Sequence, residues 1–189
     1  MLVHLLKTED RGRAIIFCSA RSTVDLVAKN LHKQGIDAEA IHGKLSQSKR
    51  LSIIDNFNKG KIDLIVASSV AARGLHIDDV THVFNYDLSQ DPQEYVHKVG
   101  RTARAGKEGK AITLLSERDY QAFGEVLKRY RLKVEEMPLP EFVRVPFDAS
   151  RDHSGGGFNR RFGHHSRDSH HGGSGRGPSR GGYGGGDRR

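Results

Sequence analysis

Short apolar runs alternate with amphipathic segments over the first 135 residues of the chain. Residues 14–19 (AIIFCS) form a continuous apolar run of strand length, which is typical of a strand that is covered on both faces of a sheet. Further β-branched runs predict strands at residues 38–42, 62–68, 81–86 and 111–115.

Helical periodicity lies between these runs. The first such helix carries apolar residues on one face (Val24, Val27, Ala28, Leu31), with Ser22 expected to cap its start and Gly35 at its end. Ser46 is expected to start a second helix that ends at Gly60, Asp91-Pro92 to open a third, and Ser116 a fourth that runs to about Tyr130. The alternation predicts an α/β fold with a mostly parallel sheet and helices on both faces.

Polar clusters follow three of the predicted strands. They are Ser19–Arg21, His42–Gly43 and Ser68–Arg73. Because ligands of such folds bind beyond the carboxyl ends of the strands, these clusters predict one shared functional edge.

Composition narrows the class of protein. The chain has 189 residues, a formal net charge of +8 and one cysteine, so it cannot form an intramolecular disulfide. No apolar run approaches the roughly 20 residues of a membrane span, and the N-terminal MLVHLLK is too short for a signal peptide. A cytoplasmic monomer with no membrane partner is expected.

The last 39 residues differ from the rest. Residues 151–189 contain 13 glycines, and their 8 arginines against 3 aspartates give a formal charge of +5. Such a composition buries too little apolar surface to offset the entropy of ordering, which predicts disorder. We therefore expect a domain at residues 1–135, an exit segment with Pro138, Pro140 and Pro146 at residues 136–150, and a basic Gly/Arg-rich tail.

Four segments of the domain carry candidate chemistry. They are AIIFCSAR (14–21), HGKLSQSKR (42–50), ASSVAARGLHI (67–77) and HKVGRTARAG (97–106). Arg101 and Arg104 in the last segment can converge on one phosphate, for which planar guanidinium groups are well suited. Taken alone, the GRxxR pattern is equally typical of a solvent-exposed basic loop that binds no phosphate.

Together, in this order, the four segments resemble the C-terminal RecA-like domain of DEAD-box RNA helicases of superfamily 2. AIIFCSAR is similar to motif IV, HGKLSQSKR to the HG…QxxR motif, SSVAARGLHI to motif V (TDVAARGLD), and HKVGRTAR to motif VI (HRIGRTGR). The resemblance covers roughly residues 1–135.

For ATP, the resemblance implies that Arg101 and Arg104 act as arginine fingers on the γ-phosphate, whose charge is spread over its equatorial oxygens. It implies that His97 couples the ATP site to the RNA site, and that Gly74 lies near the interdomain cleft. His76 stands where the family has the aspartate that accepts hydrogen bonds from the ribose hydroxyls.

For RNA, the resemblance implies that Gly43, Gln47 and Arg50 hold the backbone and that Arg50 reaches a phosphate. Ser68 stands where the family has a threonine that contacts RNA phosphate, and serine keeps the hydroxyl.

This sequence departs from the family pattern at several positions. Ser69 replaces the first aspartate of motif V, and His76 is a weaker acceptor than the carboxylate that it replaces. Lys98 keeps the charge of the usual arginine but not its bidentate geometry. Ala20 lacks the hydroxyl that motif IV commonly has, whereas Ala103 for glycine is expected to be harmless.

Two motifs of complete helicases are absent from this sequence. It has neither a G-x-x-x-x-G-K-[ST] loop nor an Asp-Glu-Ala-Asp. ATP with Mg²⁺ is therefore expected to be held mainly by a separate N-terminal RecA-like domain, and this chain alone is not expected to hydrolyse ATP. A non-enzymatic RNA-binding or annealing module, or a regulatory half acting in trans, are the alternatives.

The tail resembles the RGG-type extensions of RNA-binding proteins. Its arginines attract phosphate, and Phe158, Phe162 and Tyr183 can stack on bases. The alternative is a solubilising linker. Cys18, on an apolar run, is expected to be a buried small hydrophobe, and the histidines of residues 164–171 lack the fixed geometry of a metal site.

Overall fold

The structure, a computed structural model, describes residues 1–72, 77, 80–89, 91–102 and 108–150. The chain divides into two units, Met1–His153 and Ser154–Arg189, and all the described residues belong to the first. Among the described residues, no helix has both the length and the apolar character needed to span a membrane.

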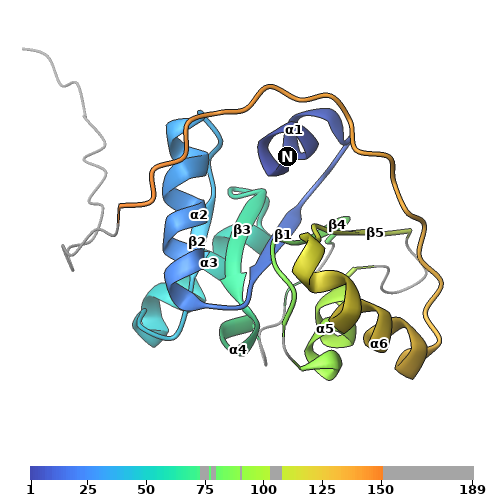
Figure 1. The fold of residues 1–189 in the computed structure, drawn as a ribbon. Helices are drawn as coiled ribbons and strands as arrows, with labels where there is room; N and C mark the ends of the chain where they lie inside the picture. Colours follow the sequence, from blue (N-terminus) through green and yellow to red (C-terminus); the bar gives the residue numbers. More distant parts are fainter. Residues whose placement is uncertain (73–76, 78–79, 90, 103–107, 151–189) are drawn as a thin grey trace, which may run out of the picture. The chain divides into compact units, whose positions relative to one another are not determined.

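A five-stranded parallel sheet forms the centre of the first unit (Figure 1). Its strands are β1 (Ala14–Cys18), β2 (Glu39–Ile41), β3 (Leu64–Ser68), β4 (His82–Asn85) and β5 (Lys110–Thr113), in the order β2-β3-β1-β4-β5. β1 lies in the middle, where Ala14 is in register with Leu64 of β3 and with His82 of β4. The predicted α/β fold and parallel sheet are confirmed.

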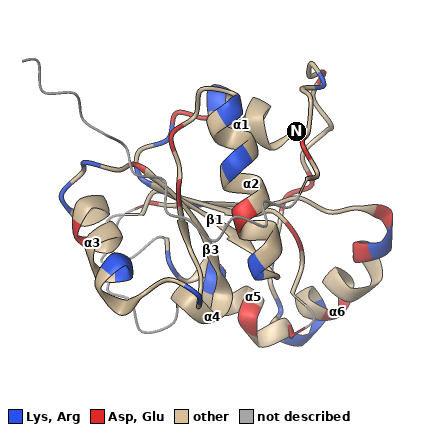
Figure 2. Cartoon of the chain, turned by 90° about the vertical axis from the view of Figure 1, so that its left-hand side faces the viewer, with Lys and Arg blue, Asp and Glu red and all other residues tan. Residues whose placement is uncertain are grey.

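The strands whose residues are all buried occupy the interior of the sheet. Every residue of β1, β3 and β4 is buried, whereas the edge strands β2 and β5 are partly exposed. β1 and β3 contain no charged residue and are therefore tan throughout in Figure 2. A strand that is apolar at every position needs cover on both faces, and two hydrophobic clusters provide it.

Helices cover the two faces separately. Ala14, Ile16 and Cys18 belong to the cluster with α1 (Leu2–Thr8) and α2 (Arg21–Lys33), and Ile15 and Phe17 to the cluster with α3 (Gln47–Asn58) and α4 (Ser69–Ala72). The remaining helices are α5 (Pro92–Val99), the 3₁₀ turn η1 (Glu117–Asp119) and α6 (Tyr120–Tyr130). Tyr95 of α5 packs edge-on against Phe123 of α6, with ring centroids 5.4 Å apart.

Local capping predictions are mostly confirmed. Ser46 caps α3 by accepting from the Lys49 amide, and Asp91 caps α5 by accepting from the Gln93 amide. The expectation for Ser22 is wrong: the N-cap of α2 is Ala20, two residues earlier, the helix begins at Arg21, and it has no side-chain cap. Once Arg21 is helical, Ser22 lies inside the first turn, where its hydroxyl is not in the capping position.

Two helices were not expected from the sequence. The apolar residues of α1, Leu2, Leu5 and Leu6, have helical spacing, but the helix has only seven residues and no side-chain cap. The four-residue α4 is too short to show a period. Both helices depend on packing against the sheet rather than on their own propensity.

After α6 the chain is extended and returns across the domain to α2, as the orange segment in Figure 1 shows. We call residues 132–150 the C-terminal strap. Phe142 lies near His4 of α1, with ring centroids 6.3 Å apart. The Asp148 amide donates to the Asn30 side chain (2.7 Å), and the Asn30 amide nitrogen donates to the Asp148 carbonyl (3.0 Å).

Charge reinforces this attachment of the strap. The Asp148 carboxylate pairs with Lys33 and, at 3.1 Å, with Lys29, and it accepts from the Ser150 amide at 2.8 Å. Hydrogen bonds from Lys33 and Ser150, together with Lys29, hold the pKa of Asp148 well below its usual range.

The lowered pKa gives the strap a predictable dependence on pH. Because the folded state favours the Asp148 carboxylate, its stabilising contribution is complete above the ordinary aspartate pKa of about 4 and is lost as the pH falls further. Thermal unfolding between pH 7 and pH 3 should therefore show a shallower loss of stability for Asp148→Ala than for the wild type. At pH 7.5, Asp148→Ala should also speed tryptic cleavage at the exposed Arg144.

Glu141→Ala is the matched control, because Glu141 is an exposed acid of the same strap. It should leave both measurements unchanged. If the stabilities of Asp148→Ala and of the wild type fell by the same amount between pH 7 and pH 3, the attachment of the strap through Asp148 would be contradicted.

Candidate functional site

The carboxyl ends of three neighbouring strands bring predicted segments to one edge of the sheet. β1 is followed by Ser19, β2 by His42 and Gly43, and β3 ends at Ser68. Because the strands are parallel, all of these residues lie on the same side of the domain, as predicted.

A carboxylate joins the ends of β1 and β4. Asp87, two residues after β4, accepts from the Ser19 amide at 2.6 Å and from the Ser19 hydroxyl at 2.9 Å. The Tyr86 amide donates to the Phe17 carbonyl at 2.9 Å and extends the pairing of the two strands. Ser19 is therefore used within the domain, where it fixes the chain before α2.

The loop after β2 presents an exposed glycine beside a fixed histidine. His42 is buried, with its Nδ1 accepting from the Lys44 amide (3.3 Å) and its Nε2 lying 2.8 Å from Asp25 Oδ1 on α2. A Cβ added at Gly43 would meet no atom within 4 Å. Packing within the domain therefore does not require glycine at this position, and the backbone is open to close approach by a ligand.

Arg50 links α3 to the short helix α4. Its Nη1 donates to the Gln47 side chain (3.2 Å) and its Nη2 to the Ala71 carbonyl (3.0 Å). Its Nε is buried and has no hydrogen-bond partner among the described residues. The guanidinium thus has an intradomain role in addition to the predicted contact with RNA.

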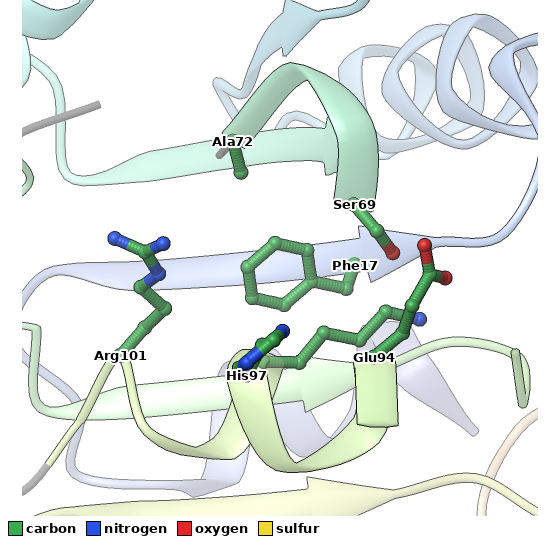
Figure 3. Close-up of a pocket in the computed structure, with 7 residues that line it drawn as sticks. Phe17, Ser69, Ala72, Glu94, His97 and Arg101 are labelled. Carbon is green, nitrogen blue, oxygen red and sulfur yellow. The ribbon is translucent and has the colours of Figure 1, made fainter. Parts of the chain in front are cut away.

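A shallow pocket lies between α4, α5 and β1 at this edge (Figure 3). It is lined by Phe17, Ser69, Ala72, Glu94, His97, Lys98 and Arg101. His97 is exposed, and Arg101 follows α5 and points toward the pocket. The pocket is therefore lined by two of the predicted ATP-site residues, His97 and Arg101, and by Ser69 of the motif V segment.

Lys98 forms part of the floor of this pocket rather than its rim. It is only 3% exposed, and its Nζ lies 5.9 Å from the centroid of the Phe17 ring. Burial lowers the pKa of Lys98, and the charges of Asp87 and Glu94 oppose that shift. Cys18 is fully buried in β1, which confirms it as a buried small hydrophobe, and this burial raises the pKa of its thiol.

Buried polar atoms without hydrogen-bond partners gather at this edge. In the part of the chain that the structure describes, they are Arg50 Nε, Ser69 Oγ, Asn85 Oδ1 and Ser89 Oγ. Asn85 ends β4, and Ser89 follows it. Unpaired buried groups cost free energy, so their concentration at one edge is typical of a functional site.

The structure thus places six of the predicted site residues, Gly43, Gln47, Arg50, Ser68, His97 and Arg101, on this side of the domain. Gly74, His76, Arg104 and the tail lie outside the described residues. Sequence reasoning did not single out Glu94 as a pocket residue. Its spacing from His97, Lys98 and Arg101, by three, four and seven residues, is the helical pattern that could have found it.

No cluster of three or more His, Cys, Asp or Glu side chains suited to a metal ion occurs within the described ranges. Arg101, His97 and Ser69 of the pocket can donate hydrogen bonds to an anion such as a phosphate, and Glu94 brings one carboxylate to the same lining. ATP with its phosphates therefore fits the donor set of this edge.

Comparisons with known proteins agree with this architecture. The helicase conserved C-terminal domain family matches residues 1–106. The DEAD-box ATP-dependent RNA helicase CshA of Geobacillus kaustophilus is 44% identical over 140 residues, which are 74% of this chain and 30% of that protein. The CshA of Listeria monocytogenes is 50% identical over 119 residues, 63% of this chain and 23% of the relative.

Solved structures show the same fold. The Escherichia coli DEAD-box protein SrmB, in a complex with regulator of ribonuclease activity A, has a TM-score of 0.64 at 41% identity, over 71% of this chain and 77% of that one. Saccharomyces cerevisiae Dbp5 bound to RNA and ADP BeF3 has a TM-score of 0.64 at 30% identity, over 68% and 35% of the two chains. The chain spans less than a third of the curated relatives that it matches.

The contacts of Arg50 lead to a prediction about stability in the absence of any ligand. Arg50→Lys loses the donor to the Ala71 carbonyl, and it should lower the free energy of unfolding by about 1–2 kcal/mol. Urea denaturation of the chain without RNA measures this loss. Lys49→Ala, at an exposed neighbour on the same helix, is the matched control and should change stability far less.

Proposed function

We propose that this chain, which belongs to the helicase conserved C-terminal domain family of DEAD-box RNA helicases, supplies one half of a composite site that couples ATP hydrolysis to RNA binding. The observation that carries the proposal is the meeting of Ser69, His97 and Arg101 in one pocket at the carboxyl edge of the sheet.

Arg101 is the central residue of the proposed ATP contact. Arg101 lies two residues after the end of α5, and its guanidinium points toward the pocket, where it can meet a phosphate that is presented across an interdomain cleft (Figure 3). A guanidinium stabilises the charge that spreads over the oxygens of a transferred phosphoryl group. Arg104 is proposed as the second finger, Gly74 and His76 as further contacts with the nucleotide, and His97 as the link to RNA.

The other half of the site is proposed to come from an N-terminal RecA-like domain. The sequence has no phosphate-binding P-loop, and the described residues offer no cluster of metal-ligand side chains. We therefore assign the binding of Mg²⁺ and most of the ATP contacts to that domain.

RNA is proposed to run along the loop after β2, the start of α3 and the end of β3. Gly43 leaves room for a sugar–phosphate backbone, and the Ser68 hydroxyl and the amide of Gln47 can donate hydrogen bonds to phosphate oxygens. Arg50 is proposed to reach a phosphate while it remains anchored to Ala71.

Two other functions share the same fold. A non-enzymatic RNA-binding module would bind RNA but give no ATP hydrolysis when a DEAD-box N-terminal domain is supplied. A regulatory half would instead change the activity of another helicase's N-terminal domain. ATPase activity measured with and without that domain distinguishes these functions from a helicase half.

Arg101→Lys tests the proposed finger. In an assembly with a DEAD-box N-terminal domain, the substitution should lower RNA-stimulated ATP turnover by on the order of 10³-fold, because an ammonium cannot reproduce the planar fork. Binding of single-stranded RNA to the chain alone should be unchanged.

The control is Arg144→Lys, at an exposed arginine of the strap, which should leave turnover and RNA binding as in the wild type. The proposal is overturned if Arg101→Lys abolishes RNA binding while ATP turnover survives, since that result would assign Arg101 to the RNA path.

The tail is proposed to hold RNA non-specifically. Its formal charge of +5 and its interleaved aromatic residues suit single-stranded nucleic acid. Removing residues 151–189 should weaken binding of single-stranded RNA. It should also make the slope of the logarithm of the association constant against the logarithm of the salt concentration less negative by about 3.

The truncation should end after Ser150, because Asp148 and Ser150 are attached to α2. Restoring the tail with its eight arginines changed to serine is the control for length. An unchanged salt slope after truncation would show that the tail is a linker.

A further inference from the structure

The turn after β2 is held closed by His42. The Leu45 amide donates to the His42 carbonyl at 3.1 Å, which closes a four-residue turn from His42 to Leu45. Inside this turn the Lys44 amide donates to His42 Nδ1 at 3.3 Å. A side chain that accepts from the amide two residues further on makes the same contact as an aspartate or asparagine in an Asx turn. His42 therefore fixes the backbone on both sides of Gly43.

These contacts require one tautomer of the His42 ring. Because Nδ1 accepts from the Lys44 amide, it carries no proton, and the proton of the neutral ring must lie on Nε2. Nε2 lies 2.8 Å from Oδ1 of Asp25 on α2, which is the distance of a hydrogen bond to a carboxylate. Asp25 thereby selects the tautomer that leaves Nδ1 able to accept, because the partner of one ring nitrogen decides the state of the other.

Neither helix stability nor attraction to RNA explains the carboxylate at position 25. Asp25 is the fifth residue of α2 and lies beyond the first turn, where a carboxylate gains most from the helix dipole. Its side chain is 55% exposed, beside a turn that is proposed to meet RNA, and a negative charge there repels phosphate. Its contact with His42 is the favourable interaction that the described residues offer it.

We infer that Asp25 is a positioning residue of the RNA-binding edge. It orients His42, and His42 in turn holds the turn that presents Gly43 to the RNA backbone. Gly43 is exposed, and a Cβ added there would meet no atom within 4 Å, so its backbone is open to close approach. A preorganised turn binds without the cost of ordering it, and loosening the turn therefore costs affinity. The inference rests on the proposed function, in which this turn contacts RNA.

The first experiment measures RNA affinity, for which positioning and simple electrostatics predict opposite signs. A fluorescent single-stranded oligouridylate is titrated with the 189-residue chain at fixed salt. Asp25→Ala removes both the charge and the acceptor, and it should weaken binding by about fivefold, which is the scale of one hydrogen bond. Asp25→Asn keeps an acceptor for Nε2 without the charge, and it should bind at least as tightly as the wild type.

Glu39→Ala is the matched control, because Glu39 is an exposed acid at the start of β2. It removes the same charge and should not weaken binding. His42→Asn supplies a side chain that can accept from the Lys44 amide without help, so in that background Asp25→Ala should have no further effect. The titrations are repeated with the eight tail arginines changed to serine, so that the tail cannot mask the effect. Thermal unfolding checks that each variant is folded.

The second experiment uses no RNA and records the tautomer directly. NMR spectra of the ¹⁵N-labelled chain should show the His42 ring with its proton on Nε2 and an unprotonated Nδ1. Asp25→Asn should preserve this state, whereas Asp25→Ala should give a mixture of tautomers and shift the amide resonances of Gly43 and Lys44. Glu39→Ala should change none of these signals.

The inference is overturned if the wild-type His42 ring carries its proton on Nδ1, or if Asp25→Ala leaves the tautomer and the Gly43 amide unchanged. It is also overturned if Asp25→Ala binds the oligouridylate as tightly as the wild type does, or if Asp25→Asn binds it as weakly as Asp25→Ala. If the wild-type chain does not bind this RNA, the proposed RNA path fails, whereas the NMR spectra still decide whether Asp25 orients His42.

Discussion

Parallel pairing of β1 with both β3 and β4 is the constraint on which the rest of this domain depends. It buries a strand on both faces and so requires apolar residues at every position from Ala14 to Cys18. It also forces the carboxyl ends of the central strands to one edge, where the chain must turn into helices. Ser19, Ser68 and Asp87 are thereby brought to the same side of the sheet.

The amino and carboxyl ends of the parallel strands differ in how completely their polar groups are hydrogen-bonded. At the amino ends of β4 and β5, Glu9 accepts from Lys110 at 2.8 Å and lies 3.7 Å from His82, and Thr81 contacts the His82 ring at 2.9 Å. At the carboxyl edge, four buried polar atoms of the described residues lack partners. A stable network at one edge and unpaired groups at the other are what a domain needs if only one edge is to meet ligands and a second domain.

The strap is also attached away from the residues of the candidate site. Asp148 of the strap contacts Lys29 and Lys33, which lie in the second half of α2. The other end of α2, at Arg21, comes shortly after the carboxyl end of β1. The residues of this attachment are thus different from Gly43, Gln47 and the residues that line the pocket. Ser150, the last described residue, is also held by α2, because Lys29 donates to its hydroxyl at 3.0 Å.

The sequence by itself determined the features that depend on a few neighbouring residues. The β-branched runs predicted the strands, Ser46 and Asp91 predicted two helix starts, and the polar clusters after three strands predicted the edge at which Ser19, Gly43 and Ser68 would lie. Each depends on interactions within about one helical turn or on the simple period of a strand. Ser22 shows the limit of such reasoning, because the helix is capped two residues earlier, at Ala20, whose side chain carries no capping group.

Only the tertiary structure decided which distant residues meet. The contact of Arg50 with Ala71, the shared pocket lining of Glu94 and Ser69 and the attachment of Asp148 to Asn30 join segments that are 21, 25 and 118 residues apart. They follow from the strand order β2-β3-β1-β4-β5, which sets helices from different parts of the chain beside one another. Local patterns do not carry that order, because the same apolar run packs equally well at several positions in a parallel sheet.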